Sequence, residues 1–218
     1  MIKNIDNTIE HLHDYNILLE SREIFLNPKN IDSETDIELA IGFIKNLRLL
    51  ESINKNPILI HHYNAGGYWA AGFAIYDAIK ASECYITMIG YGEIMSAGLL
   101  ILQAADLRLA SKNCQLMMHE GSSGIHEELT HRQAKAWSIN EKKKEELLYE
   151  ILTEKCSKGR IFLDKCSKRS QIKAYLKAQI AKNEDYFLTP EEALELGLID
   201  QIIGSDKYPH INNVSKFQ

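Results

Sequence analysis

Short apolar runs alternate along the chain with longer stretches in which apolar residues recur at helical spacing. The runs predict buried strands, and the periodic stretches predict helices packed on them. Strands are expected at 22–26, 58–62, 84–89, 107–110, 115–119 and 198–203, and helices at 37–50, 68–80, 96–105, 172–180 and 190–196. Strand, turn and helix recur at intervals of about thirty residues, which favours an α/β core of stacked crossover units.

Polar and turn-forming residues predict where individual elements begin and end. Asp32 or Ser33 is suited to cap the helix that starts near residue 37, and the segment 90–93 predicts a turn after the third strand. The last helix has a strong start signal, because Thr189 and Glu192 have the spacing of a capping box.

A long polar stretch, Glu127 to Cys156, contains neither proline nor glycine and predicts a single helix. Such a helix extends about 45 Å at 1.5 Å per residue, too long for so small a core, so it is expected to project. Trp137 lies in this polar stretch. That aromatic side chain favours an oligomerisation arm over the alternative, a solvated surface helix.

Composition indicates an ordinary globular protein with a single domain, residues 1–218. The chain has 25 Lys and Arg against 30 Asp and Glu, a formal net charge of −5, and 45% hydrophobic residues, which excludes a disordered chain. The charge balance gives no long basic face, so nucleic acid is not an expected partner. No apolar run approaches the roughly 20 residues of a membrane span, and the polar first residues lack the layout of a secretory signal. A cytoplasmic protein is therefore expected.

The chain is not expected to hold a metal or a cofactor. Its cysteines form no CxxC pair, which indicates reduced thiols rather than a zinc site. They are Cys84, Cys114, Cys156 and Cys166. The histidine pairs 61/62 and 126/131 are not predicted to bind metal, since adjacent strand residues face opposite ways and residues five apart on a helix do not converge.

Three polar residues stand at the boundaries of predicted elements, and each is of a type that takes part in nucleophilic catalysis. Ser96 opens an apolar helix, where free N–H groups and the helix dipole favour a developing oxyanion. His119 ends an apolar strand, and Asp185 stands before apolar residues, where a partly buried carboxylate is suited to orient an imidazole. Each also has a simpler interpretation, as an N-cap, a strand-edge histidine and a turn residue. The pair Gly66 and Gly67 is suited to present a backbone N–H to a carbonyl, or simply to turn the chain.

A series of motifs runs from about Leu19 to Ile203: LESREIFL, NAGG, AIYDAI, GEIMSAG, LMMH and DYFLTPEEALELGLIDQII. In this order they resemble the Clp protease proteolytic subunit (ClpP) family of serine peptidases. The resemblance implies that Ser96 is the nucleophile, His119 the general base and Asp185 the acid that orients it. It also implies that Gly67 and Ala97 supply the oxyanion-hole N–H donors.

The resemblance also implies a fold and an assembly. The fold is α/β, a ClpP/crotonase-type spiral of stacked strand-turn-helix units with a long projecting arm helix. The family forms homo-oligomers, heptameric rings stacked as a tetradecamer around a closed chamber, and an AAA+ unfoldase ATPase feeds protein into them. By this resemblance the chain is a serine endopeptidase that hydrolyses peptides or unfolded proteins through a catalytic triad.

Several departures from the family pattern bear on the site, beside a divergent segment at 1–18; among them are Glu93 and Glu120-Gly121, which stand where the family tends to have Gln and Gln-Pro. Ala65 stands where the family usually has proline, which predicts a less rigid glycine loop. The interval from His119 to Asp185 is 185 − 119 = 66 residues, longer than in the family. The surplus predicts an inserted segment at about 157–170.

Two other functions stay open. A crotonase-type acyl-CoA enzyme shares the spiral and also uses paired backbone N–H groups, but it requires a glutamate acid–base pair, for which Glu93 and Glu120 are the candidates. A non-catalytic ring subunit keeps the scaffold while its triad is misaligned. Labelling of a reactive serine separates the peptidase from both.

Overall fold

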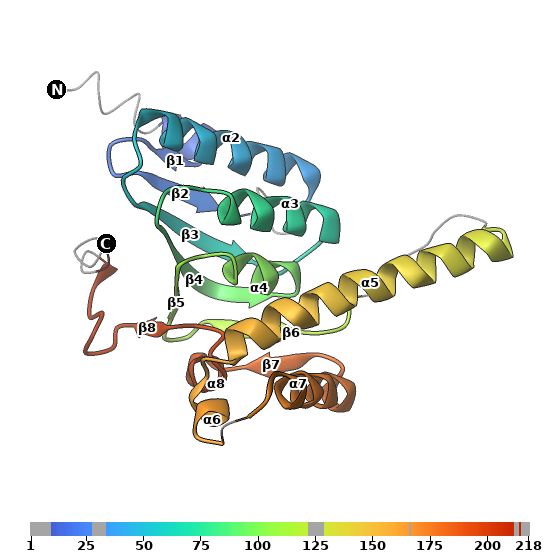
Figure 1. Ribbon diagram of the computed structural model, residues 1–218. Helices are drawn as coiled ribbons and strands as arrows, with labels where there is room; N and C mark the ends of the chain where they lie inside the picture. Colours follow the sequence, from blue (N-terminus) through green and yellow to red (C-terminus); the bar gives the residue numbers. More distant parts are fainter. Residues whose placement is uncertain (1–9, 28–33, 122–128, 166, 212–213, 215–218) are drawn as a thin grey trace.

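One mixed β-sheet organises the molecule (Figure 1). The computed structural model describes residues 10–27, 34–121, 129–165, 167–211 and 214. Within them the strands lie in the order β1-β2-β3-β4-β5-β8, with β6 beside β4 and β7 beside β6. The strands are β1 Ile17–Leu18, β2 Glu23–Leu26, β3 Ile58–Asn64, β4 Ile86–Met95, β5 Leu107–Ser111, β6 Gln115–Met118, β7 Tyr186–Leu188 and β8 Gln201–Ile203.

The helices that connect β2, β3, β4 and β5 lie side by side along the sheet (Figure 1). They are α2 Ile37–Ile53, α3 Trp69–Lys80 and α4 Ala97–Leu102. Each joins two neighbouring parallel strands, so the predicted crossover units and the α/β fold are confirmed. Four further helices follow β6: α5 His131–Cys156, α6 Arg160–Leu163, α7 Arg169–Asn183 and α8 Pro190–Leu196.

The core forms because apolar residues alternate along the strands and recur at helical spacing along the helices, so that their side chains face one another. In β3, Ile58 and Ile60 are fully buried while Leu59 is only partly so, the pattern of a strand with one face on the core. Burying such a side chain contributes roughly 1.5–3 kcal/mol. A smaller cluster covers the other face of the sheet, where Ile89 and Leu109 pack on Tyr208.

Strand β4 is longer than the sequence predicts, and the prediction of a turn at 90–93 is wrong, because these residues belong to the strand. Gly90 pairs with His62 and Ile94 with Asn64, so β4 uses four steps where β3 uses two, and the strand bulges. Before the bulge β4 pairs with β5, and after it with β6. Gly92 sits in the bulge at φ +58, where a Cβ would lie 2.6 Å from the Tyr63 ring. The glycines permit the bulge rather than ending the strand.

Two other boundaries differ from the prediction. Helix α2 is capped by Asp36, whose carboxylate accepts the Leu39 N–H at 2.8 Å, and not by Asp32 or Ser33, which lie outside the described residues. The long helix begins after Thr130, which forms a capping box with Gln133, so the expected start at Glu127 also lies outside the described residues. The last helix begins as predicted, with a capping box of Thr189 and Glu192.

Helix α5 projects from the body of the molecule (Figure 1). Its buried residues lie between Leu148 and Cys156, whereas the side chains of its first turns are exposed, Trp137 by 47%. The base of α5 packs on α7, where Lys173 pairs with Glu146 and Glu150. The segment that projects therefore contributes little burial to the chain itself.

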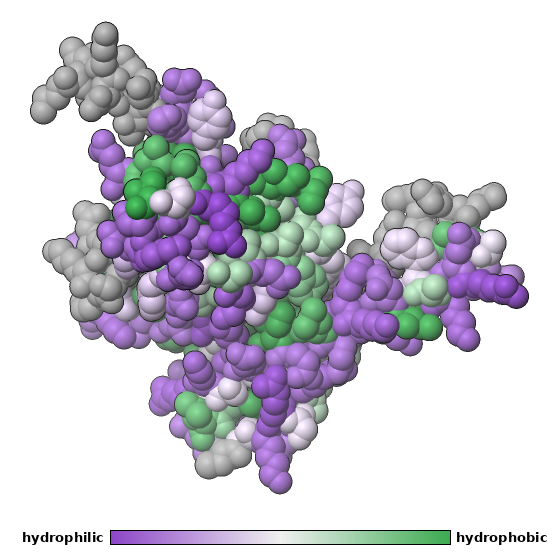
Figure 2. All heavy atoms as spheres, turned by 45° about the horizontal axis from the view of Figure 1, so that its top comes forward, coloured by the Kyte–Doolittle hydropathy of each residue, from purple (hydrophilic) through white to green (hydrophobic). Residues whose placement is uncertain are grey.

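Exposed apolar side chains lie near both ends of α2. The side of the molecule that α2 occupies carries green patches among polar atoms in Figure 2, while the projecting arm is mostly hydrophilic. Spaced four residues apart, Ile37 and Ile41 are 62% and 47% exposed, and Leu49 and Ile53 are 45% and 56% exposed. Neighbouring exposed apolar side chains are typical of interaction surfaces.

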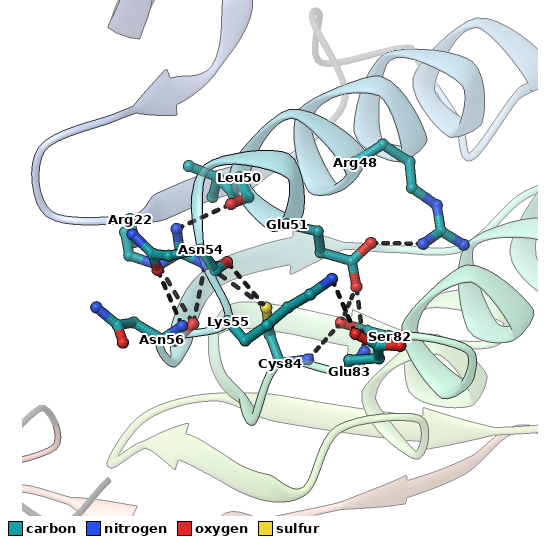
Figure 3. Close-up of polar contacts among 10 residues, drawn as sticks. All are labelled: Arg22, Arg48, Leu50, Glu51, Asn54, Lys55, Asn56, Ser82, Glu83 and Cys84. Atoms are coloured by element: carbon teal, nitrogen blue, oxygen red, sulfur yellow. Dashed lines mark hydrogen bonds and ion pairs between the residues drawn. The ribbon is translucent and has the colours of Figure 1, made fainter.

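Two buried arginines tie distant segments together. Arg22 donates to the carbonyl oxygens of Leu50, Asn54 and Asn56 at 3.0, 3.2 and 2.9 Å, and so satisfies the end of α2 (Figure 3). Arg108 is 4% exposed and binds the Asp200 carboxylate with both Nε and Nη2, at 3.0 and 2.6 Å. Its Nη1 also donates to Gln103 and to the carbonyls of residues 197 and 198, which closes the turn between α8 and β8.

A buried carboxylate lies beside the Arg22 cluster (Figure 3). Glu51 is 5% exposed and accepts hydrogen bonds from Ser82 Oγ and from Arg48 Nη1, both at 2.5 Å, and from the Glu83 N–H at 3.2 Å. Burial acts to raise its pKa, but the Ser82 bond and the Arg48 charge outweigh it, so the pKa of Glu51 lies below the usual value. The carboxylate thus stabilises the fold in its ionised form.

Candidate active site

Ser96 stands at the junction of β4 and α4 in a strained conformation. Its φ of 51° and ψ of −120° are unusual for a residue with a Cβ. It occupies the N-cap position of α4, but its side chain makes no capping hydrogen bond. The backbone N–H donates instead to the Met117 carbonyl at 3.0 Å, which ties Ser96 to β6. The simple N-cap interpretation therefore fails for this serine.

The Ser96 hydroxyl is directed at an imidazole. His119 follows β6, and its Nε2 lies 2.8 Å from Ser96 Oγ. Its Nδ1 lies 3.0 Å from Asp185 Oδ1. A carboxylate can only accept, so Nδ1 carries the proton and Nε2 is left to accept the Ser96 proton. The three side chains thus form one continuous chain of hydrogen bonds.

Strand pairing brings His119 and Asp185 together across the long interval between them. In the antiparallel pair β6–β7, Met117 faces Phe187 and Met118 faces Tyr186. The next position of this register pairs residue 119 with residue 185. The 66-residue interval therefore separates the two side chains along the chain but not in space. The segment 157–170 contains α6 and the first two residues of α7, the helix that leads into β7.

Asp185 is more open to solvent than the sequence predicts. The sequence favours a partly buried carboxylate, but the Asp185 side chain is 53% exposed, against 26% for His119. Glu184, which ends α7 at φ 58°, turns the chain immediately before β7, and Asp185 precedes the first paired residue of that strand. The carboxylate therefore lies at the surface end of the hydrogen-bond chain.

The glycine loop packs directly against the serine. Gly66 and Gly67 have φ values of +113° and +143°, which favour glycine. A Cβ on Gly66 would lie 2.7 Å from Ser96 Cβ, and one on Gly67 would lie 2.5 Å from the Thr35 nitrogen. The loop can therefore pass this close to Ser96 at Gly66, and to Thr35 at Gly67, because neither position has a side chain.

Hydrogen bonds hold the glycine loop, in which residue 65 is alanine and not the proline that the family resemblance leads us to expect. The Thr35 N–H donates to the Gly66 carbonyl at 2.7 Å, and the Thr35 carbonyl accepts the Tyr68 N–H at 2.8 Å. The Gly66 N–H donates to Asn64 Oδ1 at 2.8 Å. Sequence reasoning missed Thr35 and Asn64; Asn64 has a signal in its place before the glycines, but nothing near Thr35 in the sequence marks it.

Backbone donors flank the serine on two sides. Ala97 is the first residue of α4, where helix N–H groups have no partner within the helix. It packs closely on α3, since a Cβ on Gly72 would lie 3.1 Å from the Ala97 side chain. Gly67, on the loop, donates to no acceptor among the described residues. The site thus brings a serine hydroxyl, an imidazole and a carboxylate together beside backbone N–H groups, and these are the kinds of group that acyl transfer uses.

The two glutamates considered for other chemistry do not form a pair. Glu120 accepts the hydroxyl of the buried Tyr149 at 2.8 Å, which links the residue after His119 to α5. Burial and this bond raise the pKa of Tyr149. Glu93 lies in β4 opposite Gln115. In the part of the chain that the structure describes, no group of three histidine, cysteine or acidic side chains is suited to hold a metal ion.

Both histidines of the pair 61/62 have structural partners. His61 Nε2 binds Glu23 at 2.7 Å and its ring stacks on Phe25. His62 is buried between the Leu26 and Gly98 carbonyls, and burial lowers its pKa. Among the cysteines, Cys84, Cys114 and Cys156 are free and buried, while Cys166 lies outside the described residues.

Comparisons with known proteins agree with this α/β architecture. The family model Clp protease matches residues 6–206. The chain belongs to the Clp protease family.

Two similar proteins are both named as proteolytic subunits of the ATP-dependent Clp protease. The ATP-dependent Clp protease proteolytic subunit 2 of Treponema pallidum is 32% identical over 188 residues, which cover 85% of this chain and 83% of the relative. The protein of the same name from Pseudomonas aeruginosa is 29% identical and covers 87% and 84%. A solved structure, that of a ClpP1 point mutant from Listeria monocytogenes, has the same fold with a TM-score of 0.65 at 24% identity, over 87% of this chain and 95% of that one.

Proposed function

We propose that this protein is a serine endopeptidase that hydrolyses peptide bonds through an acyl-enzyme. The observation that carries the proposal is the hydrogen-bond chain from Ser96 Oγ through His119 to Asp185, in a chain that belongs to the Clp protease family. The strained backbone at Ser96 supports it, because such strain is concentrated at functional sites.

The chemistry follows from the three side chains in order. His119 Nε2 takes the Ser96 proton as Oγ attacks the peptide carbonyl carbon, and Asp185 stabilises the imidazolium that forms. The N–H groups of Gly67 and Ala97 stabilise the oxyanion of the tetrahedral intermediate. His119 then gives its proton to the leaving amine. A water molecule, activated by His119, attacks the acyl-enzyme and releases the new carboxylate.

The same proposal includes a ring-forming homo-oligomer. Exposed apolar faces support it: Ile37, Ile41, Leu49 and Ile53 on α2, and Trp137 on the projecting half of α5. The expected assembly is two heptameric rings in a tetradecamer, with α5 as the arm between them. The relatives are named ATP-dependent, so an AAA+ unfoldase ATPase is the expected partner and unfolded proteins or peptides are the expected substrates. No described helix is both long and apolar enough to cross a membrane.

The test is fluorophosphonate labelling followed by intact mass, on wild type and on Ser96→Ala, with oligomer size measured on the same samples. One adduct on wild type and none on Ser96→Ala, with equal oligomer size, supports the peptidase. A well-assembled wild type that takes no label favours the non-catalytic ring subunit. An assembly defect in Ser96→Ala counts against the assigned role, since the nucleophile contributes to the transition state and little to packing.

A further inference from the structure

Two buried polar side chains from outside the glycine loop hold it beside Ser96. Thr35 and Asn64 are both fully buried. Asn64 Oδ1 accepts two hydrogen bonds, from the Gly66 N–H at 2.8 Å and from Thr35 Oγ1 at 2.7 Å. Since a backbone N–H can only donate, the Asn64 atom that faces Gly66 is the oxygen, and the Thr35 hydroxyl must donate to it as well.

The backbone of Thr35 completes the brace. Thr35 and Gly67 form a parallel bridge in which the Gly66 carbonyl and the Tyr68 N–H both bond to Thr35. In such a bridge the peptide groups alternate in direction, so the Gly67 N–H points away from Thr35. Among the described residues nothing accepts a hydrogen bond from this N–H. The brace therefore uses the neighbouring groups of the loop and leaves one donor for an incoming oxygen.

The brace is anchored at both ends. The residue after Thr35 is Asp36, which caps the 17-residue helix α2, and Asn64 is the last residue of β3, paired with Ile94 of β4. Asn64 Nδ2 is buried with no partner among the described residues, which costs free energy that an apolar side chain here would avoid. The two hydrogen bonds that Asn64 Oδ1 accepts offset this cost by holding Thr35 and Gly66 in place.

We propose that Thr35 and Asn64 are positioning residues that hold the glycine loop with the Gly67 N–H directed toward the oxyanion. This inference rests on the proposed peptidase activity and on Gly67 as a donor. Neither side chain reaches the reacting atoms; each acts through the loop. Removing the Thr35 hydroxyl leaves the serine, histidine and aspartate untouched and loosens only the loop.

The experiment compares Thr35→Val with Thr35→Ser and Thr153→Val. Valine has the shape of threonine without the hydroxyl, and serine restores the hydroxyl. Thr153 is the matched control, because it is also fully buried but its Oγ1 makes no hydrogen bond with the described residues. Oligomer size, peptide kcat and KM, inhibition by a peptide aldehyde and amide hydrogen exchange of the peptide containing Gly66 are measured for each.

We expect Thr35→Val to lower kcat about tenfold with KM within twofold, less than the hundredfold or more for losing an oxyanion donor outright. Aldehyde affinity should fall by the same factor, exchange at Gly66 should speed up, and Thr35→Ser should restore all three. Wild-type kcat in Thr35→Val, or equal losses in Thr153→Val, overturns the inference. An inactive, unlabelled wild type refutes the proposed function; hydrogen exchange still tests the brace, and unchanged exchange in Thr35→Val refutes it.

Discussion

Replacing Asp185 by asparagine removes the charge that faces His119 and preserves the size of the side chain. At the 3.0 Å separation of Nδ1 and Oδ1, an imidazolium and a carboxylate attract by about 1.4 kcal/mol in bulk water and about 5.5 kcal/mol at the effective dielectric constant of a protein surface. The Asp185 side chain is 53% exposed, which places the interaction between these limits. A value of about 2.7 kcal/mol corresponds to a hundredfold loss of kcat.

The assay is steady-state hydrolysis of a fluorogenic peptide, with active sites counted by fluorophosphonate labelling. Glu184→Gln is the matched control, because it removes the neighbouring carboxylate, which has no contact with His119. We expect kcat of Asp185→Asn to fall about a hundredfold and the control to stay within twofold. A loss of about 10⁴ or more, as for a buried triad aspartate, would falsify the argument from exposure. A loss below threefold would mean that Asp185 does not orient the histidine.

Further predictions concern stability and are measured as urea unfolding at one fixed protein concentration. Arg108→Met should lower the free energy of unfolding by about 3 kcal/mol, since it leaves buried acceptors unpaired, whereas Arg160→Met, at a side chain 74% exposed, should change it by less than about 1 kcal/mol; equal effects would contradict this. The pKa of Glu51 lies below 4.5 in the folded state, so its contribution to the free energy of unfolding is complete above that pH and is lost as the pH falls through the folded pKa. The loss of stability in Glu51→Gln should therefore be large near pH 6 and smaller near pH 3. A loss of stability that does not change with pH would refute this. Gly67→Ala should abolish labelling, because its Cβ would meet backbone at 2.5 Å, while Gly42→Ala, with open space around it in a helix, should raise the free energy of unfolding by about 0.5–1 kcal/mol; a labelled Gly67→Ala variant would contradict the assigned loop geometry.

The sequence predicts the crossover core because each unit repeats a local pattern, an apolar run followed by a helical periodicity. The prediction fails where the structure that a residue adopts depends on strands that are distant in the sequence. Gly90 and Gly92 indicate a turn by themselves, but here they allow a bulge that only the pairing of β4 with β3 and β6 requires. The contact of Thr35 with Asn64 spans 29 positions and has no local mark.

The candidate site is predictable in a similar, limited sense. Ser96, His119 and Asp185 stand out through their places at element ends and through the family resemblance, and the structure brings the three side chains together. The exposure of Asp185 is not predictable, because it depends on how α7 delivers the chain into β7. Nor does the sequence reveal the β6–β7 register, on which the approach of His119 and Asp185 depends.

The short β6–β7 ladder brings His119 and Asp185 together, whatever path the chain takes between the two strands. Three cross-strand pairs, Leu116 with Leu188, Met117 with Phe187 and Met118 with Tyr186, decide where His119 and Asp185 meet. Everything from the end of β6 to the start of β7, the arm included, is an excursion that leaves and returns at fixed points. A change in the length of this segment should therefore leave His119 and Asp185 in register as long as the β6–β7 pairing is kept.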